Sequence, residues 1–158
     1  MSLYRHVQDK DDLLDEVTDR LLSEIWTPDI SRREWRRWTS EAADRLRSLL
    51  VREPVALYVY LRQPVVSPAA MARMDAMVAV LRSAGLGEAA ARRAYGAIHT
   101  YTIGFAAVEA ARIQVAVPPE EAKGATEHLA TLTSPRQFKI GLGYLLEGIR
   151  SKQGAAMP

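Results

Sequence analysis

The side chains best suited to chemistry lie along one side of the segment 87–112, which the spacing of its apolar residues predicts to be a helix. Tyr95, His99, Thr102 and Glu109 recur there at helical intervals. His99 and Glu109 could exchange a proton, but ten residues of helix hold them roughly 15 Å apart, too far for direct cooperation. The motifs of phosphate-binding loops, dinucleotide-binding folds, serine hydrolases and zinc proteases do not occur in the sequence. We therefore expect a protein that is not an enzyme.

The same strip of residues favours a ligand pocket. Exposed helix faces are typically rich in Lys, Arg and Glu, whereas Tyr, His and Thr fill the middle of this strip, where a polar-lined cavity would supply the hydrogen-bond partners that buried polar groups need. Flexible methionines after Pro68 and aromatic side chains near Pro54 suit the other walls. We predict a pocket lined by Trp38, Tyr58, Arg62, Met71, Met74, Tyr95, His99, Thr102 and Glu109. Ordinary packing in a core or at the surface is the alternative for these residues.

Helices are the elements that must position these groups, and the sequence marks several of their starts. Ser31 and Glu34 form an S-x-x-E capping box, and Ser67 and Ser134 each precede a proline at a first helical position. The segment Val55–Leu61 has the β-branched and aromatic residues of a strand, but the sequence offers no second strand to pair with it. The predicted fold class is therefore all-α. Helices are expected at about 9–27, 31–53, 54–62, 68–84, 87–112, 120–132 and 135–151.

The composition narrows the class of protein further. Hydrophobic residues make up 48% of the 158 residues, enough for a sizeable core. Because 21 basic residues nearly cancel 19 acidic ones, any DNA contact must come from a local cluster of charge. The chain has no cysteine, which removes disulfides and thiolate metal sites, and we expect no metal and no cofactor. Without a signal peptide or an apolar run of roughly 20 residues, a soluble cytoplasmic protein with no membrane partner is expected.

Two of the expected helices, 87–112 and 135–151, carry more apolar and small-residue surface than the core of one chain needs. Small residues let a second helix approach closely. We therefore predict a homodimer in which these two helices of each copy form a four-helix bundle. The predicted interface consists of Ala97, Tyr101, Gly104, Val108, Phe138, Leu142, Leu145 and Ile149, with the last four at its centre. Packing of both stripes within one chain is the alternative.

Short motifs at both ends of the chain resemble the TetR family of transcriptional regulators. Leu3–Val7 is an L-Y-x-H-V box, followed by a polar link with Lys10 and the paired leucines Leu13 and Leu14. This arrangement is similar to the end of the family's DNA-recognition helix and the start of its next helix. The segment Phe138–Gly148 looks like the last dimerisation helix of the tetracycline-repressor-type C-terminal domain.

The resemblance implies an N-terminally truncated regulator. In the family, a helix-turn-helix places its second helix in the major groove of DNA, and most of that unit has no counterpart here. Residues 1–9 would be a remnant of it, 10–28 the connecting helix, 29–151 the C-terminal ligand-binding and dimerisation domain, and 152–158 a disordered tail. By resemblance, Tyr4 and His6 would contact DNA, and Lys10 would reach a phosphate. The histidine with which the tetracycline repressor binds its magnesium–drug complex has no counterpart in Val55–Pro64, which again indicates no metal.

These expectations combine into one function. The resemblance implies a ligand-responsive transcriptional regulator, specifically a repressor, that dimerises through its C-terminal helices. A small, mostly apolar effector would bind the pocket and release the full-length protein from operator DNA. The alternative is a naturally short helical dimer that does not bind DNA and that binds or sequesters a small molecule.

Overall fold

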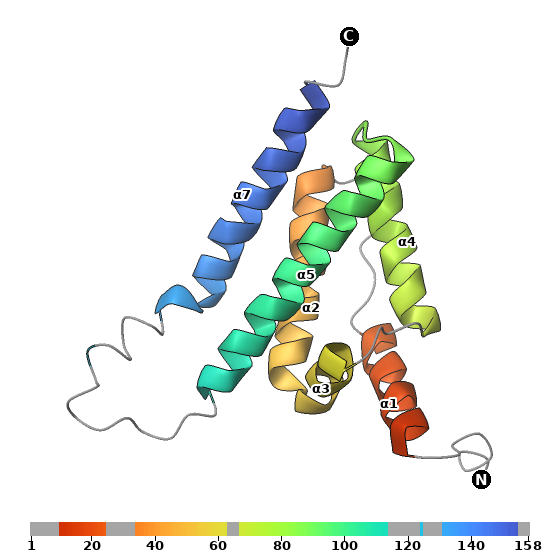
Figure 1. The fold of residues 1–158 in the computed structure, drawn as a ribbon, viewed down its shortest axis with the longest axis vertical. Helices are drawn as coiled ribbons and strands as arrows, with labels where there is room; N and C mark the ends of the chain where they lie inside the picture. Colours follow the sequence, from red (N-terminus) through yellow and green to blue (C-terminus); the bar gives the residue numbers. More distant parts are fainter. Residues whose placement is uncertain (1–9, 25–33, 63–66, 114–123, 125–130, 155–158) are drawn as a thin grey trace.

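The computed structural model describes residues 10–24, 34–62, 67–113, 124 and 131–154. Every regular element in these ranges is a helix, so the predicted all-α fold is confirmed (Figure 1). The segment Val55–Leu61, whose residues also suit a strand, is helical. Tyr4, His6 and most of the predicted helix 120–132 lie outside the described residues. The helices are α1 (Lys10–Glu24), α2 (Trp35–Arg52), α3 (Pro54–Arg62), α4 (Pro68–Ser83), α5 (Glu88–Ile113) and α7 (Pro135–Gly154).

Local signals in the sequence explain where several helices begin and end. The Ser67 hydroxyl accepts a hydrogen bond from the first turn of α4 at 3.3 Å, and Pro68 takes the first helical position. Gly85 follows α4 with a φ angle of 100°, a left-handed conformation that suits glycine. Ser134 caps α7 in the same way, because its hydroxyl accepts from the Gln137 N–H at 3.2 Å. The predicted serine–proline starts are therefore confirmed.

Two helix ends differ from the expected ones. α2 begins at Trp35, and Glu34 stands before it without a side-chain capping hydrogen bond, whereas Ser31 lies outside the described residues. α7 extends to Gly154, so the helix continues into the segment 152–158 that was expected to be a disordered tail. No proline or glycine precedes Gly154 in that last turn, and the helix therefore has no local reason to stop earlier.

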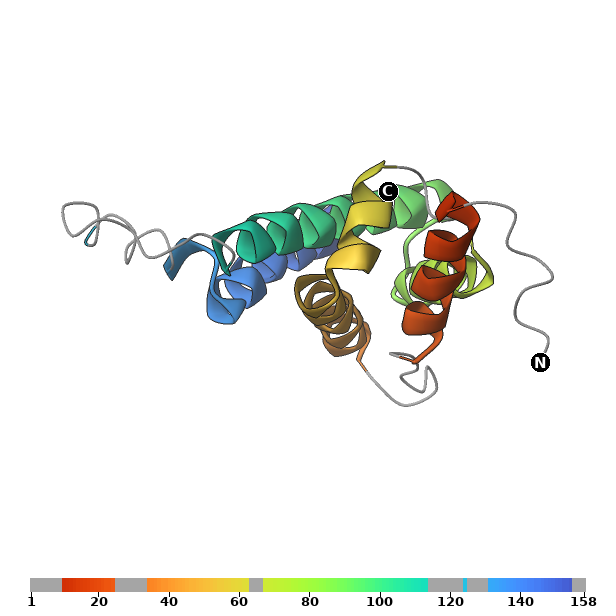
Figure 2. The ribbon, with the colours of Figure 1, turned by 90° about the horizontal axis from the view of Figure 1, so that it is seen from below.

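α2 occupies the centre of the fold and contacts α3, α4, α5 and α7. α5 crosses α2, and α7 packs beside both of these helices (Figure 1). α1 packs against α3 and α4, on the side of the molecule away from α7, as the view from below also shows (Figure 2). The fold therefore has two sides, one formed by α5 and α7 and the other by α1, α3 and α4. α2 lies between them and contacts helices of both.

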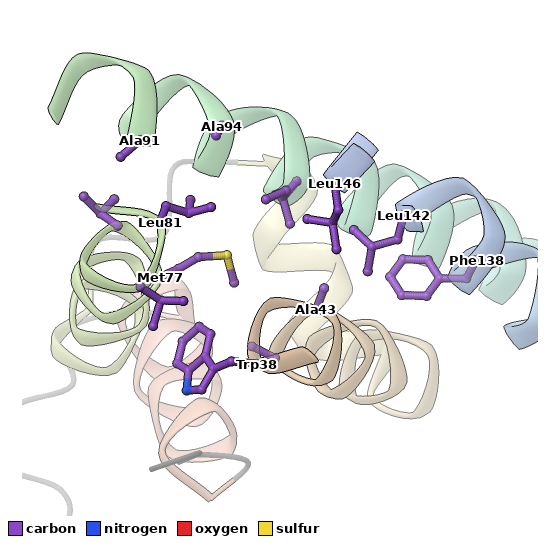
Figure 3. Close-up of a cluster of buried hydrophobic side chains, with 13 residues drawn as sticks. Trp38, Ala43, Met77, Leu81, Ala91, Ala94, Phe138, Leu142 and Leu146 are labelled. Carbon is purple, nitrogen blue, oxygen red and sulfur yellow. The ribbon is translucent and has the colours of Figure 1, made fainter. Parts of the chain in front are cut away.

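Two clusters of buried hydrophobic side chains hold the helices together. The first joins α2, α4, α5 and α7 (Figure 3) and consists of Trp38, Ala42, Ala43, Met77, Val78, Val80, Leu81, Ala91, Ala94, Ile98, Phe138, Leu142 and Leu146. The second joins α1, α2, α3 and α5 and consists of Leu22, Leu46, Leu49, Leu50, Ala56 and Ala106. Large rings and small alanines interlock in the first cluster, as the close packing of protein interiors requires. Because α2 and α5 contribute to both clusters, their contact is the centre of the core.

The first cluster corrects a predicted role of α7. Phe138 and Leu142, expected at the centre of a dimer interface, are 0% and 1% exposed within the single chain. They are buried together with Leu146, and Ile149 packs against the same cluster. Leu145 is half-buried. Helical periodicity identifies an apolar side of a helix but not the neighbour that covers it, and the bulkiest side of α7 belongs to the chain's own core.

α5 and α7 approach each other closely at Gly141. A Cβ atom on Gly141 would overlap with the Tyr101 hydroxyl oxygen, closer than real Cβ atoms essentially ever come to another atom. The same hydroxyl donates to the Phe138 carbonyl at 3.0 Å, and the two rings stack with their centroids 5.4 Å apart. The contact between the two helices therefore depends on the missing side chain at Gly141.

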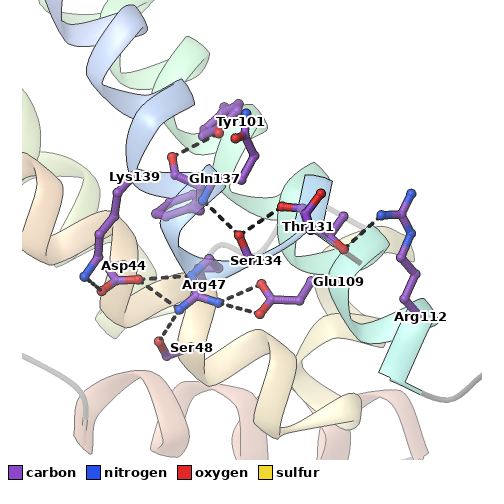
Figure 4. Close-up of polar contacts among 12 residues, drawn as sticks. Asp44, Arg47, Ser48, Tyr101, Glu109, Arg112, Thr131, Ser134, Gln137 and Lys139 are labelled. Atoms are coloured by element: carbon purple, nitrogen blue, oxygen red, sulfur yellow. Dashed lines mark hydrogen bonds and ion pairs between the residues drawn. The ribbon is translucent and has the colours of Figure 1, made fainter. Parts of the chain in front are cut away.

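A buried ion pair joins α2 to α5 beside this contact (Figure 4). The Arg47 guanidinium donates to both carboxylate oxygens of Glu109 at 2.8 and 2.6 Å, and also to Asp44 at 3.0 Å. The guanidinium carbon lies 5.3 Å from the centre of the Phe138 ring. Burial acts to lower the pKa of Arg47, but the hydrogen bonds and charges of Glu109 and Asp44 raise it overall. Arg47 therefore keeps its charge inside the fold, with Glu109 as its structural partner.

Replacing Glu109 with alanine should lower the free energy of unfolding by about 3 kcal/mol, because the buried Arg47 charge then loses its main partner. Glu24→Ala is the control, since the pair of Arg20 and Glu24 is exposed on α1 and contributes less than about 1 kcal/mol. Urea unfolding followed by circular dichroism measures both effects. A Glu109 variant as stable as the control would show that this pair does not hold α2 against α5.

Candidate functional site

A pocket lies between the two core clusters, in the space bounded by α2, α3, α4 and α5. The cavity has a volume of about 60 Å³ within a wider space of about 580 Å³ that includes open solvent. Met77 and Ile98 also belong to the first cluster, and Leu46 also belongs to the second, so the walls are continuous with the core. The lining residues are Ala42, Ala43, Leu46, Tyr60, Ala70, Met71, Arg73, Met74, Met77, Tyr95, Ile98, His99 and Thr102.

Part of the pocket wall is aromatic and polar. Tyr95 and His99 lie one turn apart on α5 and stack, with ring centroids 5.1 Å apart and an interplanar angle of 21°. The Tyr60 ring of α3 also lies against His99, with a centroid distance of 5.8 Å. Arg73 enters from α4, is 8% exposed and donates to the Ala42 carbonyl at 3.4 Å. Three helices therefore bring two phenols, an imidazole and a guanidinium into one group, which we call the polar wall.

Burial sets the charge of the polar wall. It raises the pKa of Tyr60 to about 12, against the opposing effect of the Arg73 charge, and it also raises the pKa of Tyr95. Burial, followed by the positive charge of Arg73, lowers the pKa of His99. The pKa of Arg73 is lowered overall, mainly by burial. Tyr60 and Tyr95 act to raise it, whereas the charge of Arg45 acts to lower it. At neutral pH the wall therefore holds neutral phenols and a neutral imidazole around an arginine, whose side chain stays protonated in proteins.

The remaining lining is mostly apolar and adaptable. Met71, Met74 and Met77 follow one another along α4, and Met71 is 40% exposed. Methionine is unbranched and changes rotamer easily, so these side chains can widen the narrow cavity. Thr102 also lines the pocket, but its hydroxyl donates to the Ile98 carbonyl at 2.7 Å within α5. The hydroxyl of Thr102 is thus satisfied by its own helix.

The structure brings only part of the predicted pocket together. Trp38 is 1% exposed in the first core cluster (Figure 3). Tyr58 and Arg62 are exposed on α3, where the Arg62 guanidinium lies 5.2 Å from the centre of the Tyr58 ring. Glu109 follows Thr102 by seven residues, about 10 Å along the axis of α5, and binds Arg47. These four predicted pocket residues therefore have other roles. The predicted residues that do line the pocket are Met71, Met74, Tyr95, His99 and Thr102.

Two members of the polar wall do not stand out in the sequence. Arg73 looks like a solvated charge, yet it shares a helical phase with Ala70 and Met77, and this phase was the signal that it faces inward. Tyr60 follows Tyr58 by two residues, which places their side chains about 200° apart on a helix. Only one of the two tyrosines can therefore face the cavity.

The part of the chain that the structure describes shows neither a metal site nor a helix suited to span a membrane. It contains no group of three or more His, Cys, Asp or Glu residues that could hold a metal ion. None of its helices combines the length and the apolar character that crossing a bilayer requires.

Comparison with known proteins gives this fold a family. Residues 27–153 match the family described as the tetracyclin repressor-like C-terminal domain. The chain belongs to the TetR family. An HTH-type transcriptional regulator of Saccharopolyspora erythraea is 35% identical over 108 residues, which are 68% of this chain and 46% of the relative. The HTH-type transcriptional repressor DrrR1 of Streptomyces coeruleorubidus is 33% identical over 107 residues, which are 67% of this chain and 40% of the relative.

The chain thus spans less than half the length of either curated relative. Among solved structures, the Streptomyces coelicolor TetR family protein ActR in complex with actinorhodin superimposes with a TM-score of 0.75 at 23% identity. This match covers 97% of this chain and 81% of ActR and concerns the fold. The resemblance that the sequence motifs suggest is confirmed at the level of the family. The DNA contacts of Tyr4, His6 and Lys10 stay predictions. The structure places Lys10 at the start of α1, as expected for the helix that follows the recognition helix.

The lowered pKa of His99 predicts that the stability of this chain depends on pH. The unfolded chain takes up a proton on His99 as the pH falls below about 6.5, whereas the folded chain resists it down to a lower pH. Stability should therefore decline as the pH falls through that window. The His99→Gln variant lacks this titration, so the wild type should lose more free energy of unfolding than the variant between about pH 7 and pH 5. Urea unfolding at each pH measures the difference, and equal losses would contradict the assignment.

Proposed function

We propose that this chain is the ligand-sensing and dimer-forming part of a transcriptional repressor that releases DNA when a small effector fills the pocket. The polar wall carries the proposal, because it places hydrogen-bonding groups and a charge inside a cavity that a core of hydrocarbon would otherwise fill. Two comparisons support it. DrrR1 is a transcriptional repressor, and ActR has been crystallised with the small molecule actinorhodin.

The lining favours a mostly apolar, flat effector. Methionines and alanines provide apolar contact, and the stacked pair of Tyr95 and His99 offers an aromatic surface. The present cavity of about 60 Å³ holds only a few water molecules. A larger ligand must therefore displace side chains, and Met71 and Met74 are the flexible ones on α4. Ligand entry is thus coupled to a movement on α4.

A hydrogen bond between helices offers a route from α4 to α1. The Asp19 carboxylate of α1 accepts from the Ala69 N–H in the first turn of α4 at 2.9 Å. α4 also carries Met71, Met74 and Arg73 of the pocket. A shift of α4 on ligand binding is therefore passed to α1, which follows the segment that resembles a DNA-recognition helix. The coupling free energy between two such sites is typically about 1–3 kcal/mol.

The exposed sides of α5 and α7 form a surface that fits a second copy of the chain. The two helices meet at the contact of Tyr101 with Gly141. Beside this contact, Tyr144 of α7 is 75% exposed. Small residues permit close helix packing, and covering exposed apolar surface is energetically favourable. Two-fold pairing of this surface gives the four-helix bundle of a homodimer. We call it the α5–α7 face and define it by Ala97, Gly104, Val108, Ala111, Ile140, Tyr144 and Gly148.

The Gly104→Arg variant should convert the dimer into monomers, because a long charged side chain then stands in the middle of the α5–α7 face. Gly143→Arg is the matched control. Gly143 lies on the side of α7 that carries Lys139 and Glu147, and a Cβ placed on either glycine meets nothing within 4 Å beyond its chain neighbours and the backbone of its own helix. Both variants gain the same helix propensity over glycine. Size-exclusion chromatography with light scattering gives the masses. A dimeric Gly104 variant would move the interface elsewhere.

DNA release tests the function itself in a version of the protein extended upstream in its reading frame. This version should shift a DNA fragment from its own promoter region in a gel at low salt, and a pocket ligand found by thermal-shift screening should abolish the complex. Asp19→Ala should leave the DNA complex intact but weaken its response to the ligand, because the link from α4 to α1 is cut. Failure of the extended protein to bind would favour the DNA-independent alternative.

A further inference from the structure

The described lining of the pocket contains a cationic side chain. Arg73 is the one charged side chain among the described lining residues, and no Asp, Glu or Lys occurs among them. Its guanidinium is almost fully buried, and the groups of the polar wall that face it, the Tyr60 and Tyr95 hydroxyls and the His99 ring, are uncharged at neutral pH. A charge that is shielded from water acts strongly on a ligand that enters the same space. The pocket therefore distinguishes ligands by their charge.

We propose that the effector is a planar aromatic molecule with an acidic oxygen, a carboxylate or an ionised phenol, that binds the guanidinium of Arg73. This inference rests on the proposed ligand-sensing function and adds the chemical class of the ligand. Arginine pairs with such oxygens through short, charge-assisted hydrogen bonds. The Tyr60 and Tyr95 hydroxyls can donate to the same oxygen or to a neighbouring carbonyl.

The geometry of the polar wall also suits the aromatic part of such a ligand. Tyr95 and His99 present nearly parallel rings, with an interplanar angle of 21°, so a flat ligand can lie along them. The methionines of α4 supply the flexible apolar contacts. The Arg73 charge repels an ammonium group in the same position. Cationic aromatic ligands are therefore disfavoured.

Three probes that share one ring system and differ in charge test this inference: anthraquinone-2-carboxylate, anthraquinone-2-carboxamide and 2-(aminomethyl)anthraquinone. Isothermal titration of the whole chain should show the carboxylate binding about tenfold or more tighter than the neutral amide. The amine should bind more weakly than the amide. Equal binding of all three probes would overturn the charge preference while leaving ligand sensing intact. A tighter amine, or no binding of any probe, would overturn the proposal as well.

Substitution of Arg73 locates the effect. Arg73→Gln should reduce carboxylate binding about tenfold or more and leave amide binding within about threefold of the wild type. Arg73→Lys keeps the charge and should keep the order of the three probes, which covers the case in which the glutamine variant does not fold. Arg62→Gln, an exposed arginine on α3, is the matched control and should change nothing. A carboxylate preference that survives in Arg73→Gln would place the anion elsewhere. Loss of DNA release with normal probe binding would instead contradict the proposed function alone.

Discussion

The rest of the structure depends on how α5 is covered, because this helix presents a different set of side chains to the core, to the pocket and to the α5–α7 face. One side, with Ala91, Ala94 and Ile98, forms the first core cluster with α2, α4 and α7. A second side presents Tyr95 and His99 to the pocket. The third side belongs to the α5–α7 face and is exposed in the single chain. A helix side made of small and apolar residues is more stable when it is covered, so the fold of one copy leaves a surface on α5 that a partner can cover.

The pocket exists where the two core clusters fail to merge. Hydrocarbon side chains close-pack, but the phenols of Tyr60 and Tyr95, the His99 ring and the Arg73 guanidinium need polar contacts that a close-packed core does not provide. Burial disfavours the ionised form of such groups, as the raised pKa of Tyr60, about 12, indicates. Local departures from the rules of core packing are expected at functional sites, and this pocket combines one with a cavity.

Much of the fold could be predicted from the sequence, and the reasons for the misses are specific. Ser67, Gly85 and Ser134 mark helix ends through their own backbone chemistry, so these boundaries are local information. Phe138 and Leu142 show that an apolar side can be recognised before its neighbour is known, and the structure assigns both to the chain's own core rather than to a dimer. The packing of the whole chain decides which helix covers which side. The apolar stripe of a single helix does not carry that information.

The candidate site follows the same division. His99 and Tyr95 were predictable, because unusual polar residues share one side of a long helix. Glu109 shares that side but lies too far along the axis, where Arg47 of α2 binds it. Arg73 escapes prediction, since a charged residue on a helix normally faces solvent and its burial depends on groups from α3 and α5. Position along an axis and partners from other helices are tertiary properties.

Coverage of the α5–α7 face by a second copy is the requirement that can be tested most directly. Because the sequence has no cysteine, Ala72→Cys on the exposed surface of α4 allows one nitroxide label per chain. Double electron–electron resonance then reports distances between labels on different chains only. A two-fold dimer paired through the α5–α7 face predicts one dominant distance, which disappears when Arg replaces Gly104. A sample without dipolar modulation, or with a distance that survives this replacement, would contradict the pairing.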